Sequence, residues 1–572
     1  MLFNHKLPIG RQEILRAGEL LKKYKAGKAN LEQRVVDDEL WWELRHWEAM
    51  GRSRKTEETH PKATSAWLFN AITNKHADAM DNYPEPVVLP REPSDRQAAR
   101  SLSQVLPVVL EQNGFEQTYS DNWWEKLKHG TAAYGVFWNN NRDNGLGDID
   151  VRAIDLLKLF WEPGITDLQQ SKNLFIAELC DREELEAAYP RLKGKSLGSG
   201  VDIKQYLYDD SVDTAGKCVV VDWYYKLRRP DRRTVLHYAK FVGTELLFAS
   251  ENDPRWRDTG WYAHGLYPVV LDVLFPEKGT PCGFGYVAVC KEPQLYIDDL
   301  SSRVLKSAMM QTTPRWFISE GTAVNDGQLL DWNESLVRVA GPLDENRLRQ
   351  FSVDSLDGNV LAVLQMKIEE LKETAGSRDV NTGGTGGGVT AAAAIAALQE
   401  AGSKTSRDML SGSYRALVEI SRLCIELMRQ FYDEGRAFRV TGGGGEERFV
   451  RLSNELLREQ PLPGTDAPLY RRPIFDLKVR AQKKNPFTRA EQNERAKELY
   501  RLGFFAPGKE QQALEALELM EFEGAVELRE RLRERLAAQP QADGSGQRVP
   551  AGNAHTIEGQ KAKAQRPAAV PQ

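Results

Sequence analysis

The segment Thr382–Thr390 reads TGGTGGGVT and is the first candidate for a ligand-binding loop in this sequence. A P-loop follows the pattern GxxxxGK[ST], in which backbone amides surround the phosphates of a nucleotide and a lysine contacts the β and γ oxygens. Here Val389 stands where that lysine would be, and a helical pattern rather than an apolar strand precedes the loop. We therefore expect a flexible connector between two helices and no cofactor.

Histidine, cysteine and serine patterns do not predict catalysis or metal binding. The eight histidines contain no HExxH spacing, and neither GFG nor LGSGV matches the GxSxG pattern of a nucleophile elbow. The five cysteines are far apart, without a CxxC pair, so neither a disulfide framework nor a zinc site is predicted. They are Cys180, Cys218, Cys282, Cys290 and Cys424. We expect reduced thiols, no metal and no enzymatic activity.

Acidic and aromatic side chains are further candidates for binding groups. Asp148 and Asp150 could be metal ligands, but a DID sequence after a glycine turn at a strand edge is typical of solvated surface. The chain has 13 tryptophans, which suggests base stacking. Their positions within amphipathic helices and strands favour packing or subunit contacts instead.

Composition limits the classes of protein that the chain can belong to. Its 572 residues predict roughly three or four structural units, with an ordinary 41% of apolar and 28% of charged residues. The formal net charge of −5 disfavours tight, non-specific holding of nucleic acid, although it does not exclude contact with DNA. The longest apolar run, Val389–Leu398, is half alanine and much shorter than the ~20 residues of a membrane helix. The N-terminal sequence MLFNHKLPIGRQE does not read as a signal peptide. We expect a soluble protein.

The elements that position these residues change character along the chain. Residues 8–50, 61–82 and 95–129 carry apolar side chains near helical spacing, and the proline-rich YPEPVVLPREP between the last two predicts a bend. Residues 131–275 contain runs of β-branched and aromatic residues, with RRPDRR as a hairpin connection, and predict antiparallel sheet. Helices and strands in separate blocks indicate an α+β fold.

Two apolar stripes at helical spacing follow the sheet region. The first is Ile297, Leu300, Val304 and Ala308, and we expect the acidic pair Asp298 and Asp299 on the opposite side of that helix. A short β-like unit with RWFIS and LVRVAGP separates it from the second stripe. That stripe is Leu356, Val360, Leu364, Ile368 and Leu371.

A long helical pattern follows the Gly-rich loop, from Thr390 to about Gly435. We expect its buried face to consist of Leu410, Tyr414, Leu417, Cys424, Leu427 and Phe431. The runs ERFVRL and IFDLKVR then predict strands that return to the sheet region. A further helical block extends to about Ala538, and the Pro-, Gly- and Gln-rich remainder is predicted to be disordered.

This ordered set of elements resembles the portal proteins of tailed bacteriophages. FGYVAVCKEPQLYIDDLSSRVLKSAMMQTTPRW resembles a first stem helix entering a clip, and DSLDGNVLAVLQMKIEELKETAG resembles the returning stem helix. GVTAAAAIAALQEAGSKTSRD is similar to the start of a tunnel helix, and VRAIDLLKLFWEPGITDLQQSKNLFIAEL to a wing region. The resemblance spans most of the chain and rests on the order of the elements, because no single motif in it is specific.

The resemblance implies a portal-like protomer with the following parts: 1–130 the N-terminal helical part of the wing, 131–288 the β-rich wing, 289–313 the first stem helix, 314–353 the clip, 354–375 the second stem helix, 376–389 the tunnel loop, 390–435 the tunnel helix, 436–487 β segments returning to the wing, 488–538 a helical crown and 539–572 a disordered tail. The implied channel-lining residues of the stem are Lys367 and Lys372. The implied DNA-facing residues of the tunnel loop are Arg378, Asp379, Asn381, Thr382, Gly383, Gly384, Thr385, Gly386 and Gly387.

The resemblance also implies a function. A portal protein forms a ring of twelve subunits at one capsid vertex, through which double-stranded DNA is packaged and ejected and by which the head is joined to the tail. Implied partners are further copies of the chain, the terminase motor, a head-tail adaptor, and the major capsid and scaffolding proteins, with no membrane. The implied location is the virion, after synthesis in the host cytoplasm. The alternatives are another structural virion or scaffold protein and, less favoured, a nucleic-acid-processing enzyme, which would need a Walker lysine.

Overall fold

The computed structural model describes residues 8–51, 62–195, 197–198, 216–228, 234–312, 315–318, 348–351, 358–376, 404–441, 447–461, 470–483, 494, 497–503, 513–514, 517 and 532. The chain divides into two compact units, Met1–Lys484 and Asn485–Gln572. Helices and antiparallel strands occupy largely separate stretches of the first unit, which confirms the predicted α+β fold.

The N-terminal region is helical, as predicted, but is divided more finely. Its helices are α1 (Arg11–Trp42), α2 (His46–Ala49), α3 (Trp67–Asp81), α4 (Arg96–Gln112) and α5 (Phe115–His129). The single helix expected over 95–129 is interrupted at Gly114, whose φ of +61° belongs to the left-handed region that glycine adopts easily. Apolar residues three and four apart, such as Leu102, Val105 and Val109, bury one side of α4.

The proline-rich segment predicted to be a bend is a strand, β1 (Asn82–Pro90), which pairs antiparallel with β18 (Phe475–Lys483). The backbone N–H and C=O of Val88 both bond to the Ser103 hydroxyl rather than to β18. Pro84, Pro86 and Pro90 each lie an even number of residues from Val88, so their ring nitrogens point away from β18, like the N–H of Val88. These prolines therefore remove no hydrogen bond between β1 and β18. The bend prediction was wrong because it ignored this spacing.

Residues 131–275 form two antiparallel sheets, as predicted. The smaller sheet has the order β3-β2-β9, with β2 (Thr131–Asn139), β3 (Asp148–Ile154) and β9 (Val269–Val273). The larger has the order β4-β5-β6-β7-β8, with β4 (Leu159–Trp161), β5 (Asn173–Asp181), β6 (Lys217–Arg228), β7 (Thr234–Val242) and β8 (Glu245–Ala249). Arg228 pairs with Thr234 at the end of the β6–β7 ladder, as expected for a hairpin across RRPDRR.

Helices cover both faces of the larger sheet. On one face, the N-terminal half of α1 contributes Ile14, Ala17, Leu21 and Tyr24 to a core with Phe175 and Trp223 of the sheet. On the other face, α6 (Arg182–Ala188) and the residues that follow it bury Leu185 and Leu192 against the sheet.

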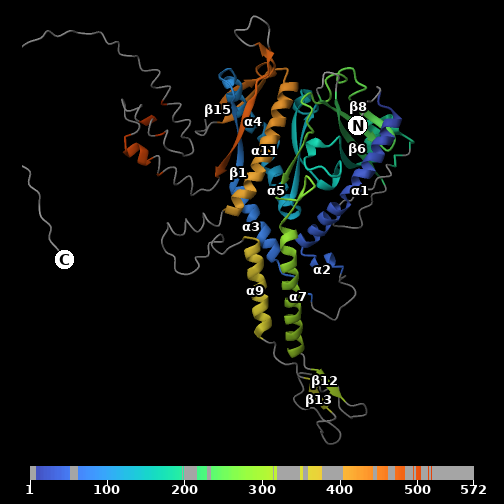
Figure 1. Cartoon of the computed structure of the whole chain (residues 1–572), viewed down its shortest axis with the longest axis vertical. Coiled ribbons are helices and arrows are strands. Elements are labelled where there is room, and N and C mark those ends of the chain that lie inside the picture. The colour runs from blue at the N-terminus through green and yellow to red at the C-terminus, as the bar shows by residue number, and fades with distance from the viewer. Residues whose placement is uncertain are drawn as a thin grey trace, which may run out of the picture. The chain divides into compact units, whose positions relative to one another are not determined.

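Long helices follow the sheet region, as predicted (Figure 1), although residues 390–403 of the predicted third helix lie outside the described residues. The helices are α7 (Tyr286–Thr312), α9 (Gly358–Thr374) and α11 (Lys404–Phe431). The short strands β10 (Phe275–Pro276) and β11 (Gly283–Phe284) pair just before α7. β12 (Arg315–Ile318) follows α7, and it pairs with β13 (Leu348–Phe351), which precedes α9.

ERFVRL and IFDLKVR are strands, as predicted, but neither pairs with the sheets of residues 131–275, contrary to the expected return to the sheet region. They form β15 (Glu447–Leu452), which pairs with β14 (Arg436–Thr441), and β18, which pairs with β1. The remaining paired strands are β16 (Gln460–Pro461) and β17 (Tyr470–Arg471). Single-turn 3-10 helices are η1 (Pro93–Asp95), η2 (Asp143–Gly145), η3 (Leu156–Lys158), η4 (Leu168–Gln170), η5 (Pro190–Leu192) and η6 (Asn454–Leu456).

The second unit is described only at a few residues, where Ala513, Leu517 and Leu532 form a small buried cluster. Most of the predicted terminal helical block and all of the predicted disordered tail lie outside the described residues. Within the described part of the chain, no helix combines the length and the apolar character that crossing a bilayer requires.

Candidate functional site: the long helices and their anchors

Helices α7 and α9 lie side by side and pack through the second predicted stripe (Figure 1). Val360, Leu364 and Ile368 are partly buried on α9, and Leu371 is fully buried. Leu356, the first residue of the predicted stripe, lies outside the described residues. The apolar stripe of α9 is therefore confirmed, and it holds two segments together that are far apart in the sequence.

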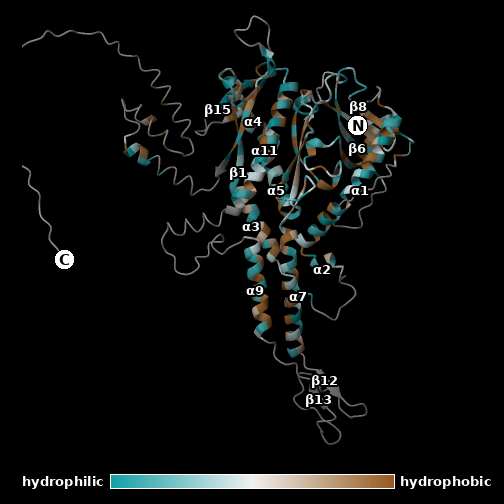
Figure 2. Cartoon of the chain, in the orientation of Figure 1, coloured by the Kyte–Doolittle hydropathy of each residue, from teal (hydrophilic) through white to brown (hydrophobic). Residues whose placement is uncertain are grey.

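Other apolar side chains on these two helices are exposed in the single chain, and Figure 2 shows apolar residues along both helices. They are Tyr296, Leu305 and Met309 of α7, and Leu361, Val363 and Met366 of α9. Met366 is 55% exposed and Met309 is 54% exposed. Large apolar residues grouped on one pair of helices are typical of a surface that another protein surface covers.

Both lysines predicted to line a channel lie on α9, but they contact different neighbours. Lys367 forms an ion pair with Glu370 at 2.6 Å and its ammonium lies 5.4 Å from the centre of the Tyr296 ring of α7. Lys372 lies over the ring of Trp67, at the start of α3. A separation of five residues turns the side-chain direction by one full turn of the helix plus about 140°. The two lysine side chains therefore leave the helix in different directions.

The C-terminal end of α9 is held by a lysine of α3. Lys75 Nζ donates to the carbonyl oxygen of Gly376 at 3.3 Å. The side chain is buried, which lowers the pKa of Lys75, and a cation at this position complements the partial negative charge of the helix end. The Gly-rich loop begins after this anchor, and its predicted DNA-facing residues, Arg378 to Gly387, lie outside the described residues.

The N-terminal half of α7 is anchored by a buried polar network around Asp298. Its carboxylate lies 2.5 Å from Nδ1 of His46, and it accepts hydrogen bonds from Ser65 and Gln294. His46 Nε2 lies 3.0 Å from the carbonyl oxygen of Trp41, so both ring nitrogens have oxygen partners. The expectation that Asp298 lies opposite the buried side of α7 was wrong, because α2 and the segment before α3 cover it.

Glycines allow the beginning of α7 to touch the end of α5. A Cβ atom on Gly285 would lie 2.2 Å from the carbonyl oxygen of Lys128, and one on Gly130 would lie 2.0 Å from the carbonyl carbon of Phe284. Gly130 also has a φ of +84°. The GFG sequence at 283–285 therefore serves close backbone packing.

Helix α11 is anchored by a fully buried ion pair. Lys126 of α5 lies 2.7 Å from Asp272 of β9, and its ammonium also donates to the hydroxyl of Ser413 and the carbonyl of Met409 on α11. Ser413 in turn donates to Asp272, and the ring of Trp123 lies 4.5 Å from the ammonium. The pair thus links α5, the smaller sheet and α11 at one point. The buried face of α11 agrees with the prediction: Leu410, Leu417, Cys424 and Leu427 are buried, and Tyr414 and Phe431 are partly buried.

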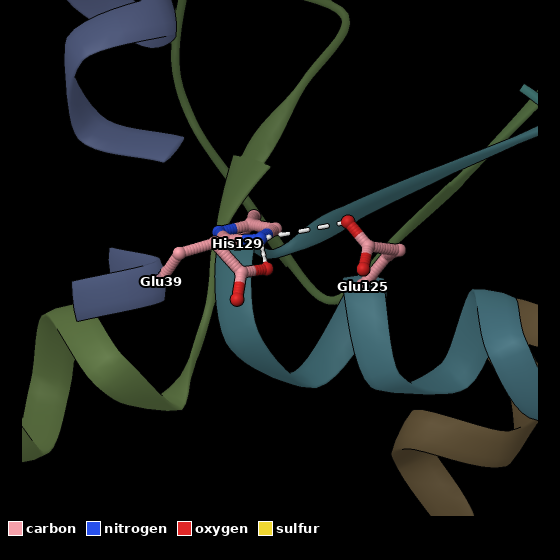
Figure 3. Close-up of side chains that lie close together, drawn as sticks. All are labelled: Glu39, Glu125 and His129. Carbon is pink, nitrogen blue, oxygen red and sulfur yellow. Dashed lines mark hydrogen bonds and ion pairs between the residues drawn. The ribbon is translucent and has the colours of Figure 1, made fainter. Parts of the chain in front are cut away.

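A cluster of charged groups joins α1 to the end of α5, as Figure 3 shows for Glu39, Glu125 and His129. His129 Nε2 lies 2.8 Å from Glu39 and 3.5 Å from Glu125, and its Nδ1 lies 3.6 Å from Asp38. Burial alone would lower the pKa of His129, but Asp38, Glu39 and Glu125 outweigh it and raise the pKa to about 9. Burial alone would raise the pKa of Glu39. The charges and hydrogen bonds of His129 and Lys128 outweigh burial and lower this pKa to about 2.

The same cluster has the donor types of a metal site, but its chemistry fits a salt-bridge network better. Metal binding requires a neutral imidazole, whereas the carboxylates around His129 favour the imidazolium. The ammonium of Lys128 bonds to both Glu39 and Glu125 and so occupies the position between them. We therefore assign the cluster a structural role.

Two other groups of side chains weighed in the sequence have structural roles. Asp148 accepts a hydrogen bond from the hydroxyl of Tyr432 at 2.7 Å, and Asp150 lies 3.2 Å from Arg142. The prediction of a solvated Asp148 was wrong, because the segment after α11 covers it. Trp123 is fully buried, and Trp42 and Trp124 belong to a partly buried aromatic group, in agreement with packing.

Sequence reasoning did not identify the anchors Lys126, Asp272, His46 and Asp298. One signal was available: Lys126 follows Tyr119 and Trp123 at helical spacing, on the apolar side of α5. A lysine at such a position is either at the surface or paired in the core, and only the packing of α11 decides between the two.

The fold and these anchors define an α+β protein in which buried polar side chains fix the long helices to the N-terminal helices and to β9. The model of the phage P22-like portal protein family matches residues 43–266 and 277–572. The chain therefore belongs to the phage P22-like portal protein family, whose members are ring-forming structural proteins of the phage head. No protein of the curated collection matches the chain.

Proposed function

We propose that this chain forms a closed, twelve-subunit ring at one vertex of the capsid, and that double-stranded DNA passes through its channel during packaging and ejection. The ring also joins the head to the tail. The observation that carries the proposal is the set of exposed apolar side chains on α7 and α9, of which Met309 and Met366 are more than half exposed. Neighbouring copies of the same helix pair would cover this surface.

In this proposal the predicted parts keep their assignments. Helices α7 and α9 are the stem, β12 and β13 belong to the clip, and the Gly-rich segment is the tunnel loop that precedes the tunnel helix α11. Further proposed partners are the terminase motor during packaging and the head-tail adaptor afterwards, with capsid and scaffolding proteins during assembly. Lys367 and Lys372 remain proposed channel-lining residues.

Three anchors support a mechanical role for the long helices. Lys75 holds the end of α9, the His46–Asp298 network holds α7, and the Lys126–Asp272–Ser413 network holds α11. The Gly-rich segment therefore lies, in sequence, between two helices that are each fixed to the same body. A loop mounted in this way can move against passing DNA while its attachment points stay in place.

The experiment is a deletion of Asn381–Gly387 in the infecting phage. We expect normal rings, because the deletion removes no anchor, and a reduced yield of full-length packaged genomes. A matched variant with Thr382 and Thr385 changed to Lys should slow translocation in a salt-sensitive manner, since added cations bind phosphates. Normal packaging by both variants would contradict the assignment of the loop, and failure of the deletion variant to form rings would make the segment a structural connector.

A further inference from the structure

Two of the five cysteines face each other across neighbouring strands. Cys180 of β5 and Cys218 of β6 are direct partners in the antiparallel register. Both are free thiols, and Cys218 Sγ lies 3.7 Å from the carbonyl oxygen of Cys180. Directly opposed residues project to the same face of a sheet, so the two side chains are neighbours although the sequence separates them by 38 positions.

The backbone spacing at this position meets the Cα–Cα criterion of a disulfide. Two residues further along the ladder, Arg182 N donates to the carbonyl oxygen of Gly216 at 3.1 Å. Along an antiparallel ladder, hydrogen-bonded and non-hydrogen-bonded pairs of residues alternate. Since Arg182 and Gly216 form a hydrogen-bonded pair, Cys180 and Cys218, two residues away, form one as well. The Cα atoms of these pairs are about 5.5 Å apart, within the range of about 4.4–6.8 Å that disulfides span. Their Cβ atoms are also about 5.5 Å apart, so bond formation requires the two strands to bring them about 1 Å closer.

The surroundings differ for the two thiols. Cys218 is buried among Leu185, Val220 and Val242, and Cys180 is partly exposed at the edge of the same apolar cluster. Burial raises the pKa of both thiols, and the neighbouring Glu178 adds to the effect at Cys180. The thiolate fraction of both groups is therefore small near neutral pH and exchange is slow, and Cys180 is the one that an external reagent can reach first.

We propose that Cys180 and Cys218 form a disulfide by exchange with a low-molecular-weight disulfide such as oxidised glutathione. The Cys180 thiolate attacks one sulfur of the reagent, the reagent's S–S bond breaks, and one glutathione thiolate leaves and takes up a proton. Cys218 then loses its proton and attacks the Cys180 sulfur, releasing the second glutathione. Two protein thiols are oxidised and one glutathione disulfide is reduced to two thiols.

The bond would link β5 to β6 at the end of the sheet that α6 covers. The loop that it closes contains α6 and residues 199–215, which the structure does not describe. A cross-link restricts the unfolded chain more than the folded one, so the larger sheet would become more stable in an oxidising medium than in a reducing one. This modification site is independent of the ring and channel proposed above.

The experiment compares the full-length chain in reduced glutathione and in excess oxidised glutathione. Peptide mapping by mass spectrometry, without reduction, should find the Cys180 and Cys218 peptides joined after oxidation, with the loss of two hydrogen masses. Cys218→Ser should instead carry one glutathione on Cys180, because no second thiol displaces it, and Cys180→Ser should remain unmodified at Cys218. The control is Cys290→Ala, which changes a buried thiol of α7 away from the two strands. This variant should still form the bond between Cys180 and Cys218.

Thermal unfolding provides a second readout. Oxidation should raise the unfolding temperature of the wild type and of Cys290→Ala, and should not raise that of Cys180→Ser or Cys218→Ser. The proposal is overturned if oxidised wild type carries only glutathione on Cys180, or if both thiols stay unmodified. It is also overturned if the linked peptide forms only after the chain has been unfolded.

Discussion

At the scale of residues, the most informative groups are charges inside the core. Lys126 and Asp272 are almost completely inaccessible to solvent, and each is surrounded by partners: a carboxylate, a hydroxyl and a carbonyl for the lysine, and an ammonium and a hydroxyl for the aspartate. An uncompensated charge at such a depth is far more costly than an exposed one. The pair therefore fixes the position of α11 relative to α5 and β9.

Replacement of Lys126 by Met should lower the free energy of unfolding by about 3–5 kcal/mol, because it leaves Asp272 buried without its countercharge. The double variant Lys126→Met, Asp272→Leu should recover a part of this loss. Chemical denaturation followed by circular dichroism measures both. Lys172→Met is the matched control, since its ion pair with Glu162 is largely exposed and should change stability by less than about 1 kcal/mol. Equal effects at Lys126 and Lys172 would contradict the anchor.

His129 predicts a dependence of stability on pH. Its pKa is about 9 in the folded chain against an ordinary 6.5, so the folded state binds more protons between these values and stability falls as pH rises through them. The full contribution is about 3 kcal/mol, present below pH 6.5 and lost above pH 9. Lys28 acts in the opposite direction from about pH 8 upward, because burial lowers its pKa to about 8.

The test of His129 is therefore the unfolding temperature between about pH 7 and pH 8. The wild type should lose stability over this interval, and His129→Gln, which cannot carry the charge, should lose clearly less. Glu39 stays ionised throughout, since its pKa is about 2. A wild type and a variant with the same slope would show that the imidazole is not charged in the folded protein.

At the scale of elements, the sequence predicted what depends on local periodicity. The stripe of α9 and the buried face of α11 follow from apolar residues repeating about every 3.6 positions, and the strands of residues 131–275 follow from alternation with a period of two residues. It did not predict what depends on partners far along the chain. Whether Asp298 faces water is decided by His46, and whether the prolines of β1 break a strand is decided by the side on which β18 pairs.

The two kinds of apolar residue on α9 predict different defects. Leu364→Asp should weaken the packing of α9 on α7 within one chain, because that side chain is partly buried there, and should reduce both folding and assembly. Met366→Asp should leave the fold intact and prevent the ring, because Met366 is exposed in the single chain. Light scattering after size-exclusion chromatography, with circular dichroism, separates the two defects.

Glu369→Gln is the control for these variants, as an exposed residue on the same helix. It should form rings with normal helix content. If Met366→Asp assembles as well as Glu369→Gln, then the exposed apolar residues of α9 are not a surface between copies of this chain.

At the scale of the whole molecule, the chain belongs to a family of structural proteins, and the described residues show how its long helices are held. Three of the buried polar contacts serve as anchors, and they join α7, α9 and α11 to α2, α3, α5 and β9. In the proposed function, such fixed attachment points would keep the long helices in place while DNA passes through the ring.

The central claim is that copies of this chain close into a ring around a DNA channel, with α7 and α9 packed between neighbours. Electron cryomicroscopy of the purified full-length protein tests it most directly. The account predicts rings with a central hole and twelve-fold symmetry, in which Met309 and Met366 lie against neighbouring subunits. Monomers, filaments or closed shells, or rings in which these two side chains remain in contact with solvent, would contradict it.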